Sequence, residues 1–197
     1  MCLLIETIKI VDGQIQNAAY HNRRFNRARK ELFSCKDDID IVEQLKLQSE
    51  ALNGIHKCTI TYNETIVDIK VQPYTIRKIE SLKLIVDDAI DYSYKYADRE
   101  SLNKLLAQRG ACDEILIIKN GLITDTSFSN IAFFDDEKWV TPSKPLLKGT
   151  KREKLIDEEL IEQAEIKVSD LNKFNKVSLI NAMLELGDTV VDCKNIN

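Results

Sequence analysis

The stretch over residues 113–142 constrains the fold of this 197-residue chain more than any other, because two apolar runs enclose a group of small polar side chains. The run at 115–118 has the length and composition of a buried strand. Asn120-Gly121 follows it and predicts a two-residue hairpin turn, since both positions of that turn need positive φ. The chain becomes apolar again at 131–134, and we expect a further strand there.

A cluster of hydroxyl, carboxylate and amide side chains lies between these expected strands. Its members are Thr124, Asp125, Thr126, Ser127, Ser129 and Asn130. Polar groups placed next to buried strands bond to each other or to a ligand. The cluster is therefore either a loop that satisfies its own backbone through side-chain turns or part of a ligand site. The residues alone leave both interpretations open.

Composition limits the class of protein. With 44% hydrophobic and 30% charged residues, the chain can form one domain or two small ones around a real core. A formal net charge of -4 argues against general nucleic-acid binding, and no apolar run approaches a membrane span. The N-terminus lacks the features of a secretory signal. Five cysteines without CxxC spacing and two distant histidines favour a cytoplasmic protein and give no local support for a metal site.

Hydrophobic periodicity and turn residues divide the chain into strands and helices. We expect strands at residues 2–10, 57–62, 65–71 and 82–86, and helices at about 20–33, 41–52, 99–108 and 153–163. Pro73 ends the early strands. We therefore expect a small α/β subdomain at 1–76, a linker at 77–80 and a larger subdomain at 81–197.

One lysine stands among aromatic residues just before the helix expected at 99–108. Residues 92–96 read Tyr-Ser-Tyr-Lys-Tyr, with Lys95 as the lysine. A lysine held among aromatic rings is partly desolvated, which favours the neutral amine and makes it a nucleophile. The alternative is that the side-chain stem of Lys95 only packs on a ring.

Two further segments suggest anion binding. The helix expected at 20–33 is rich in arginine, and for most of these residues a solvated basic face is the plain interpretation. A nucleic-acid helix is disfavoured because no aromatic residues are interleaved for stacking. Gly149-Thr150 precedes the last expected helix, where a glycine lets the backbone approach an anion and helix-terminal N–H groups bind it. The same pair is also a common helix cap.

Four segments together resemble the class IV aminotransferase family of enzymes that depend on pyridoxal 5'-phosphate (PLP). That family includes branched-chain and D-amino-acid aminotransferases and 4-amino-4-deoxychorismate lyase. The segments similar to its motifs are His21-Asn22-Arg23-Arg24-Phe25 (His-x-x-Arg-Leu), Lys95-Tyr96-Ala97-Asp98-Arg99 (Lys-x-x-Asn-Arg of the lyase branch), Thr124-Asp125 followed by small residues and Asn130 (Thr/Ser-Glu), and Gly149-Thr150-Lys151-Arg152 (Gly-x-x-Arg). The chain departs from the pattern with Asp98 in place of Asn and Asp125 in place of Glu.

The resemblance implies a role for each segment. Lys95 attaches the cofactor and then acts as general acid and base. Asp125 faces the pyridine nitrogen of PLP and keeps it protonated. The implied phosphate ligands are Arg24, the backbone amides near Gly149, Thr150 and Lys151, and the hydroxyls of Thr126 or Ser127. Arg77 and Arg99 are candidates for binding a substrate carboxylate, although a solvated linker arginine is the plainer interpretation of Arg77.

The resemblance also implies an α+β fold with two α/β subdomains of the D-amino-acid aminotransferase-like type. We expect the second half to be barrel-like and the cofactor to lie in the cleft between the halves, with Lys95 and Asp125 from the second half and Arg24 from the first. A homodimer acting on a small-molecule amino substrate is implied as well.

The same cofactor and residues serve two reactions in this family. The lyase removes pyruvate from 4-amino-4-deoxychorismate and leaves 4-aminobenzoate, a folate precursor, whereas an aminotransferase releases a keto acid. Arg99 after Lys95 and the absence of long insertions favour the lyase. A non-enzymatic dimeric scaffold that retains the fold is the alternative from another class, supported by the short N-terminus and by Asp125.

Overall fold

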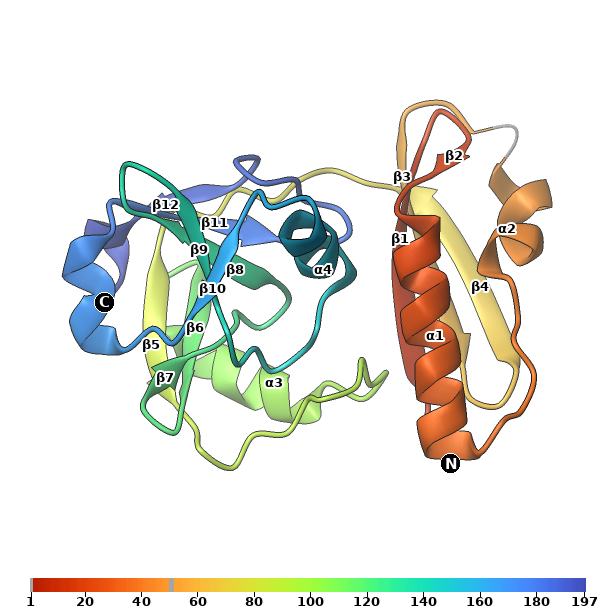
Figure 1. Ribbon diagram of the computed structural model, residues 1–197, viewed down its shortest axis with the longest axis horizontal. Coiled ribbons are helices and arrows are strands. Elements are labelled where there is room, and N and C mark those ends of the chain that lie inside the picture. Colours follow the sequence, from red (N-terminus) through yellow and green to blue (C-terminus); the bar gives the residue numbers. More distant parts are fainter. Residues whose placement is uncertain (1, 50–51) are drawn as a thin grey trace. The chain divides into compact units, whose positions relative to one another are not determined.

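The computed structural model describes residues 2–49 and 52–197, which form two compact units, and each unit is described by itself (Figure 1). Unit 1 comprises Met1–Ile76 and Tyr94–Asp98, and unit 2 comprises Arg77–Ser93 and Arg99–Asn197. The chain therefore passes between the units three times.

Two assignments made from the sequence differ from this division. Residues 77–80, expected to be a linker, belong to unit 2, and residues 94–98, expected in the second half, belong to unit 1. For residues 94–98 the reason is backbone pairing with the start of unit 1, at and just before its first strand. The N–H of Ile5 donates to the carbonyl of Lys95 at 2.9 Å, and the N–H of Ala97 donates to the carbonyl of Leu3 at 2.8 Å.

Unit 1 is a four-stranded antiparallel sheet with two helices. Its elements are β1 (Leu4–Val11), β2 (Gln14–Ile15), α1 (Ala18–Phe33), α2 (Ile41–Ser49), β3 (Ile55–Tyr62) and β4 (Ile66–Pro73). The strand order is β2-β1-β3-β4. Helix α2 confirms the helix expected at 41–52 as far as Ser49, and residues 50–51 of that expectation lie outside the described residues.

The core of unit 1 forms where one face of β1 meets α1. Side chains alternate along a strand, and the inward set of β1 includes Leu4, Ile8 and Ile10, all fully buried. Helix α1 packs Phe25 and Ala28 against them and covers this face of the sheet (Figure 1). The same alternation brings polar Glu6 into the apolar row.

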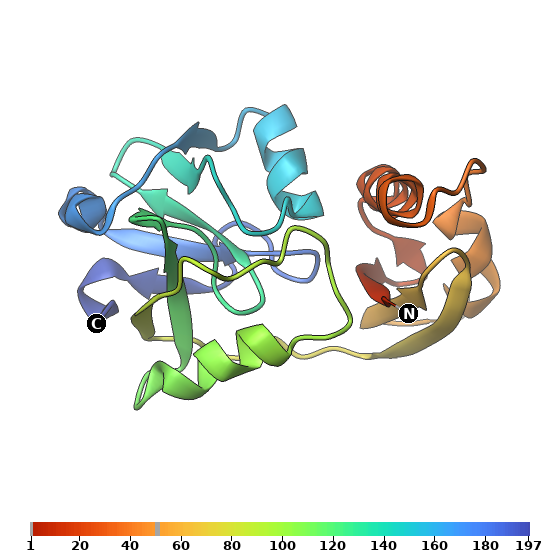
Figure 2. The ribbon, with the colours of Figure 1, turned by 90° about the horizontal axis from the view of Figure 1, so that it is seen from below.

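Unit 2 contains two sheets, two α-helices and three short 3₁₀ helices. Its elements are β5 (Leu82–Val86), α3 (Glu100–Leu106), η1 (Ala107–Arg109), β6 (Glu114–Lys119), β7 (Leu122–Ile123), β8 (Asn130–Phe134), β9 (Trp139–Pro142), α4 (Thr150–Asp157), β10 (Glu162–Ala164), η2 (Val168–Lys173), β11 (Lys176–Ile180), β12 (Val190–Asp192) and η3 (Cys193–Asn195). The sheet orders are β5-β6-β7 and β10-β9-β8-β11-β12. Helices α3 and α4 lie on opposite sides of these strands (Figure 2).

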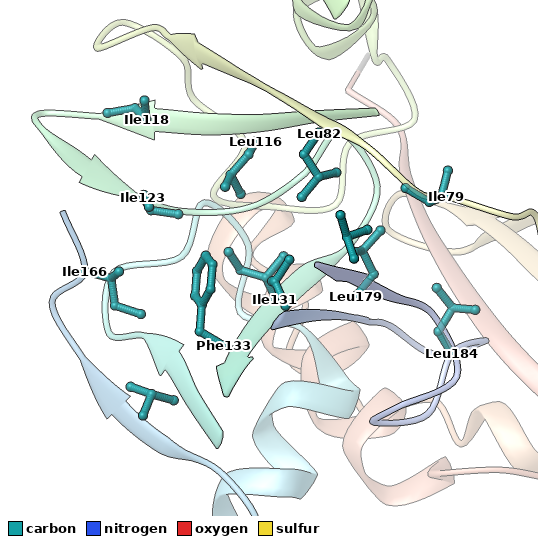
Figure 3. Close-up of a cluster of buried hydrophobic side chains, with 13 residues drawn as sticks. Ile79, Leu82, Leu116, Ile118, Ile123, Ile131, Phe133, Ile166, Leu179 and Leu184 are labelled. Atoms are coloured by element: carbon teal, nitrogen blue, oxygen red, sulfur yellow. The ribbon is translucent and has the colours of Figure 1, made fainter. Parts of the chain in front are cut away.

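The two sheets of unit 2 share one apolar core. Figure 3 shows Leu116 of the smaller sheet facing Ile131, Phe133 and Leu179 of the larger one, and all four are fully buried. The expected α+β class is confirmed. Within residues 77–93 and 99–197, however, the strands form two open sheets, so the expected barrel-like half does not close.

The Asn120-Gly121 turn between β6 and β7 is confirmed, since both residues have positive φ (52° and 75°). The helix expected at 153–163 is α4 instead, which begins at Thr150 and ends at Asp157. Residues near the expected end form strand β10, because they pair in parallel with β9. Among the residues described, no helix has the length and apolar composition that crossing a bilayer requires.

Candidate active site

The carboxylate of Asp125 is the centre of the polar cluster in unit 2. It follows β7, is 4% exposed and accepts two hydrogen bonds, from Nδ2 of Asn130 at 2.9 Å and from the N–H of Leu147 at 3.0 Å. Burial raises the pKa of Asp125 to about 6, although these two hydrogen bonds and the charge of Arg152 act in the opposite direction. A cation placed against this carboxylate would therefore be stabilised.

The loop after Asp125 satisfies much of its own bonding capacity. The hydroxyl of Thr126 lies 2.8 Å from that of Ser129 and accepts the Ser129 N–H at 3.0 Å. Ser127 donates its N–H to Glu114 at 3.3 Å, and its carbonyl accepts from Arg99 at 2.7 Å. The self-bonded loop is thus confirmed, and it surrounds a buried carboxylate; a ligand role for the cluster stays a prediction.

Gly149 approaches this cluster closely. It is the residue before α4, and a Cβ added to it would lie 1.9 Å from Oδ1 of Asn130. Asn130 cannot easily withdraw, because its Nδ2 donates both to Asp125 and to the carbonyl of Leu147 at 2.8 Å. Only glycine therefore fits here, and it brings the N-terminus of α4 up to Asn130, which in turn donates to Asp125.

We predict that Gly149→Ala lowers the free energy of unfolding by about 1–3 kcal/mol, the usual cost of overpacking a buried position. The physical reason is the close approach to Asn130. Urea unfolding measures the result, and Gly149→Ala is also introduced into a protein that already carries Asn130→Ala. There the clash partner is gone, so the alanine at position 149 should cost much less. An equal cost in both backgrounds would contradict the assignment of the clash.

The first turn of α4 is buried and basic. Thr150, Lys151 and Arg152 are 3%, 3% and 6% exposed. The ammonium of Lys151 forms an ion pair with Glu185. Helix α4 has no side-chain cap at Gly149, so its N-terminal amides are suited to an anion.

Arg152 joins α4 to the larger sheet. Its guanidinium donates to the oxygens of three residues: Pro142 (2.7 Å), Gln163 (2.8 Å) and Thr141 (3.3 Å). In the sequence Arg152 stood out only as the last residue of the Gly-x-x-Arg motif. Its contacts make it the residue that fixes the start of α4 on β9 and β10.

The two arginines proposed for substrate binding brace the loop of unit 2. Arg77 donates to the buried carboxylate of Glu114 at 2.9 Å and lies over the ring of Phe128, 5.4 Å from its centroid. Arg99 donates to the carbonyl of Ser127. Glu114 was missed in the sequence because a strand beginning with a charged residue is unremarkable. Substrate binding by Arg77 and Arg99 stays a prediction.

Unit 1 contains a second buried polar group, formed by Glu6, His21 and Arg24. Arg24 donates from Nε to Oε1 of Glu6 at 2.7 Å and from Nη2 to Oε2 at 2.6 Å. Nδ1 of His21 lies 2.8 Å from Oε2 of Glu6. All three residues are at most 7% exposed. The expected phosphate ligand Arg24 is thus held in a bidentate pair with a carboxylate.

Lys95 lies in unit 1, within electrostatic reach of this group. Burial lowers the pKa of His21, contact with Glu6 opposes that effect, and the charges of Arg24 and Lys95 add to the lowering. Lys95 is half-buried, and its neighbours Tyr94 and Tyr96 have rings 6.1 Å apart in an edge arrangement. The two rings thus contact each other, and the expected desolvation of Lys95 by aromatic rings stays a prediction.

Each unit therefore brings together part of the set predicted from sequence. Unit 1 groups Lys95 and Arg24 with Glu6 and His21. Unit 2 groups Asp125 with the loop that carries Thr126 and Ser127, and with the α4 start at Gly149, Thr150 and Lys151. Their roles toward a cofactor stay predictions.

The raised pKa of Asp125 gives a pH-dependent stability. A carboxyl whose pKa is about 6 in the folded state, against an ordinary value near 4, binds its proton more tightly when folded. The stabilisation that this carboxyl gives to the folded state is therefore full at low pH and is lost as the pH rises through about 6. When the pH is lowered from about 7.5 to about 5, the unfolding free energy of the cofactor-free wild-type protein should therefore rise by about 1 kcal/mol more than that of Asp125→Asn. The unfolding free energies are measured by urea unfolding at each pH. The same change with pH in both proteins would contradict this prediction.

Comparison with known proteins gives a match to one family and a relative of similar length. The model of the amino-transferase class IV family matches residues 92–188. An "Uncharacterized protein" of Haemophilus influenzae (strain Rd) is 40% identical over 182 residues, which cover 91% of this chain and 97% of that protein.

Solved structures agree with this match. A crystal structure from Haemophilus somnus 129PT, named "putative 4-amino-4-deoxychorismate lyase", is 36% identical with a TM-score of 0.88 and covers 94% of this chain and 98% of its own. A "putative amino-acid aminotransferase" from Mesorhizobium loti is 19% identical, covers 100% of both chains with a TM-score of 0.81, and shows the shared fold. The chain belongs to the class IV aminotransferase family, whose members are PLP-dependent enzymes.

Proposed function

We propose that this protein is a PLP-dependent lyase that removes pyruvate from 4-amino-4-deoxychorismate and leaves 4-aminobenzoate, a step of folate biosynthesis. The observation that carries the proposal is the 36% identity, over 94% of this chain, to a protein named as such a lyase. Arg99, four residues after Lys95, supports the lyase over a transaminase because the lyase branch has arginine at the matching position.

The residues present fit PLP. Asp125 is a desolvated carboxylate with a raised pKa, and a protonated pyridine nitrogen is a cation that would relieve its burial. Helix α4 begins after Gly149, which has no side chain to stand over the N-terminal amides of the helix, and such amides suit an anion. Arg24 supplies a buried guanidinium, which suits a phosphate.

Each residue then has a defined task. The Nζ of Lys95 would hold the cofactor and would act as the general acid and base that takes a proton from the substrate and returns it. Asp125 keeps the pyridine nitrogen protonated. When bound, PLP acts as the electron sink for the bond that breaks at the substrate.

The remaining residues orient these groups. Arg24 and the backbone amides near Gly149, Thr150 and Lys151 hold the phosphate, and the hydroxyls of Thr126 and Ser127 are secondary candidates. Asn130 and Leu147 hold the two oxygens of Asp125 and so fix the orientation of its carboxylate. Arg77 and Arg99 are proposed to reach a substrate carboxylate.

We also propose that the protein acts in the cytoplasm as a homodimer on a small amino substrate. The resemblance to the family supports the dimer. Light scattering at several protein concentrations tests it, and a constant monomer mass would overturn it.

The test of function is direct. Purified protein loaded with PLP is incubated with 4-amino-4-deoxychorismate, and 4-aminobenzoate and pyruvate are quantified together. Equal amounts of both products support the lyase. A keto acid formed from an amino-acid donor, without 4-aminobenzoate, would establish a transaminase instead. Absence of any PLP absorption band would leave the dimeric scaffold as the function to pursue.

A further inference from the structure

Glu6 occupies a position where a charge is costly. It is fully buried, on the inward face of β1 between Leu4 and Ile8, in a row that is otherwise apolar. An isolated carboxylate in such a place would be strongly destabilising or would take up a proton. Glu6 does neither, so its neighbours must compensate the charge.

The compensation comes from α1. Burial alone would raise the pKa of Glu6, but the charge of Arg24 and the hydrogen bonds from His21 and Arg24 outweigh it and lower the pKa to about 2. Glu6 is therefore ionised at neutral pH, and the lowered pKa of His21 keeps that ring neutral. The three side chains together carry no net charge.

This arrangement fixes the plane of the Arg24 guanidinium. A guanidinium has five N–H donors in a rigid fork, and the bidentate contact with Glu6 uses one on Nε and one on Nη2. Since the group is planar, holding that edge determines where the other donors point. His21 holds Oε2 of Glu6 and so prevents the carboxylate from turning.

We propose that Glu6 is the positioning residue of the phosphate subsite: it orients Arg24, through the bidentate pair, toward the phosphate of the cofactor. This rests on the proposed function. Because the Glu6–Arg24 pair is neutral, the phosphate is recognised here by directed hydrogen bonds from Arg24 rather than by excess positive charge.

The experiment compares binding of PLP with binding of pyridoxal, which lacks the phosphate. Equilibrium dialysis gives both dissociation constants for the wild-type chain and for Glu6→Gln. Glutamine keeps the size of Glu6 but has one acceptor oxygen and no charge, so the guanidinium loses its bidentate partner. PLP binding should weaken about tenfold, the order expected for lost contacts to a charged group, while pyridoxal binding stays within about twofold.

Asp37→Asn is the matched control. Asp37 holds Arg29, another buried arginine of α1, through Nη2 contacts of 3.1 and 3.2 Å. Removing its charge disturbs an arginine pair on the same helix without touching Arg24, and the preference for PLP should be unchanged. Arg24→Lys keeps the positive charge but loses the fork, and it should lose the preference as Glu6→Gln does.

The outcomes separate cleanly. Equal weakening of PLP and pyridoxal in Glu6→Gln, or an unchanged preference, would overturn the positioning role while leaving the proposed function in place. If Glu6→Gln does not fold, Arg24→Lys decides the matter, and retention of the preference there overturns the inference. A wild-type protein that binds neither compound would overturn the proposed function and this inference with it.

Discussion

Replacing Lys95 with alanine should reduce turnover by at least about 1,000-fold, which is within the range for removing a general acid and base alone. The loss should be chemical rather than structural. Residues 94–98 are attached to β1 by backbone hydrogen bonds, including the carbonyl of Lys95 itself, and alanine keeps these bonds. Initial rates of 4-aminobenzoate formation measure the effect, and the visible absorption band of bound PLP should be lost in the same variant.

The matched control for Lys95 is Lys70→Ala. Lys70 lies on β4 of the same unit, is 77% exposed and pairs only with its neighbour Asp68 among the contacts of the described residues. This variant should keep the wild-type rate and absorption band. A Lys95→Ala protein with more than about a tenth of the wild-type rate would show that another amine performs the chemistry.

Asp125→Asn should lower turnover by about 100-fold, the order seen when one preorganised electrostatic contact is removed from a site. The amide is nearly the same shape but carries no charge, so it cannot hold the pyridine nitrogen protonated. The carboxylate accepts one hydrogen bond from Asn130 and one from Leu147, whereas the amide turns an N–H group toward one of these two donors and loses that hydrogen bond. Rates are measured at saturating PLP, so that weaker binding is not taken for slower chemistry.

An exposed aspartate provides the comparison for this variant. Asp136 lies in the turn between β8 and β9, and Asp136→Asn should leave turnover unchanged because asparagine tolerates its positive φ of 77°. Full activity of Asp125→Asn at neutral pH would contradict the role of the carboxylate.

Local patterns in the sequence predicted much of the fold. The Asn120-Gly121 turn, the strand at 82–86 and the polar cluster around Asp125 all depend on neighbours within a few residues, where periodicity and turn chemistry act. The helix expected at 153–163 is confirmed only as far as Asp157, and the rest of that prediction is wrong for the complementary reason. Its last part pairs with β9, and a short parallel edge strand leaves little periodic signal.

The parts of the candidate site that were missed depend on distant pairing. Nothing near Lys95 in the sequence indicates that its segment pairs with β1, some ninety residues earlier. Glu6 did carry a signal, because the alternation of β1 places it on the same face as Leu4 and Ile8. Its partners His21 and Arg24 are three residues apart on α1 and so lie on one helix face.

The three passages of the chain between the units also determine the order in which unit 1 can be completed on the ribosome. The outer edge of β1 near Leu3 and Ile5 receives its partner only when residues 94–98 have been translated, after β5 of the other unit. Until then that edge is unpaired, and unpaired edges are where strands of other chains add on. Lys95 thus arrives with the segment that protects the nascent sheet from such additions.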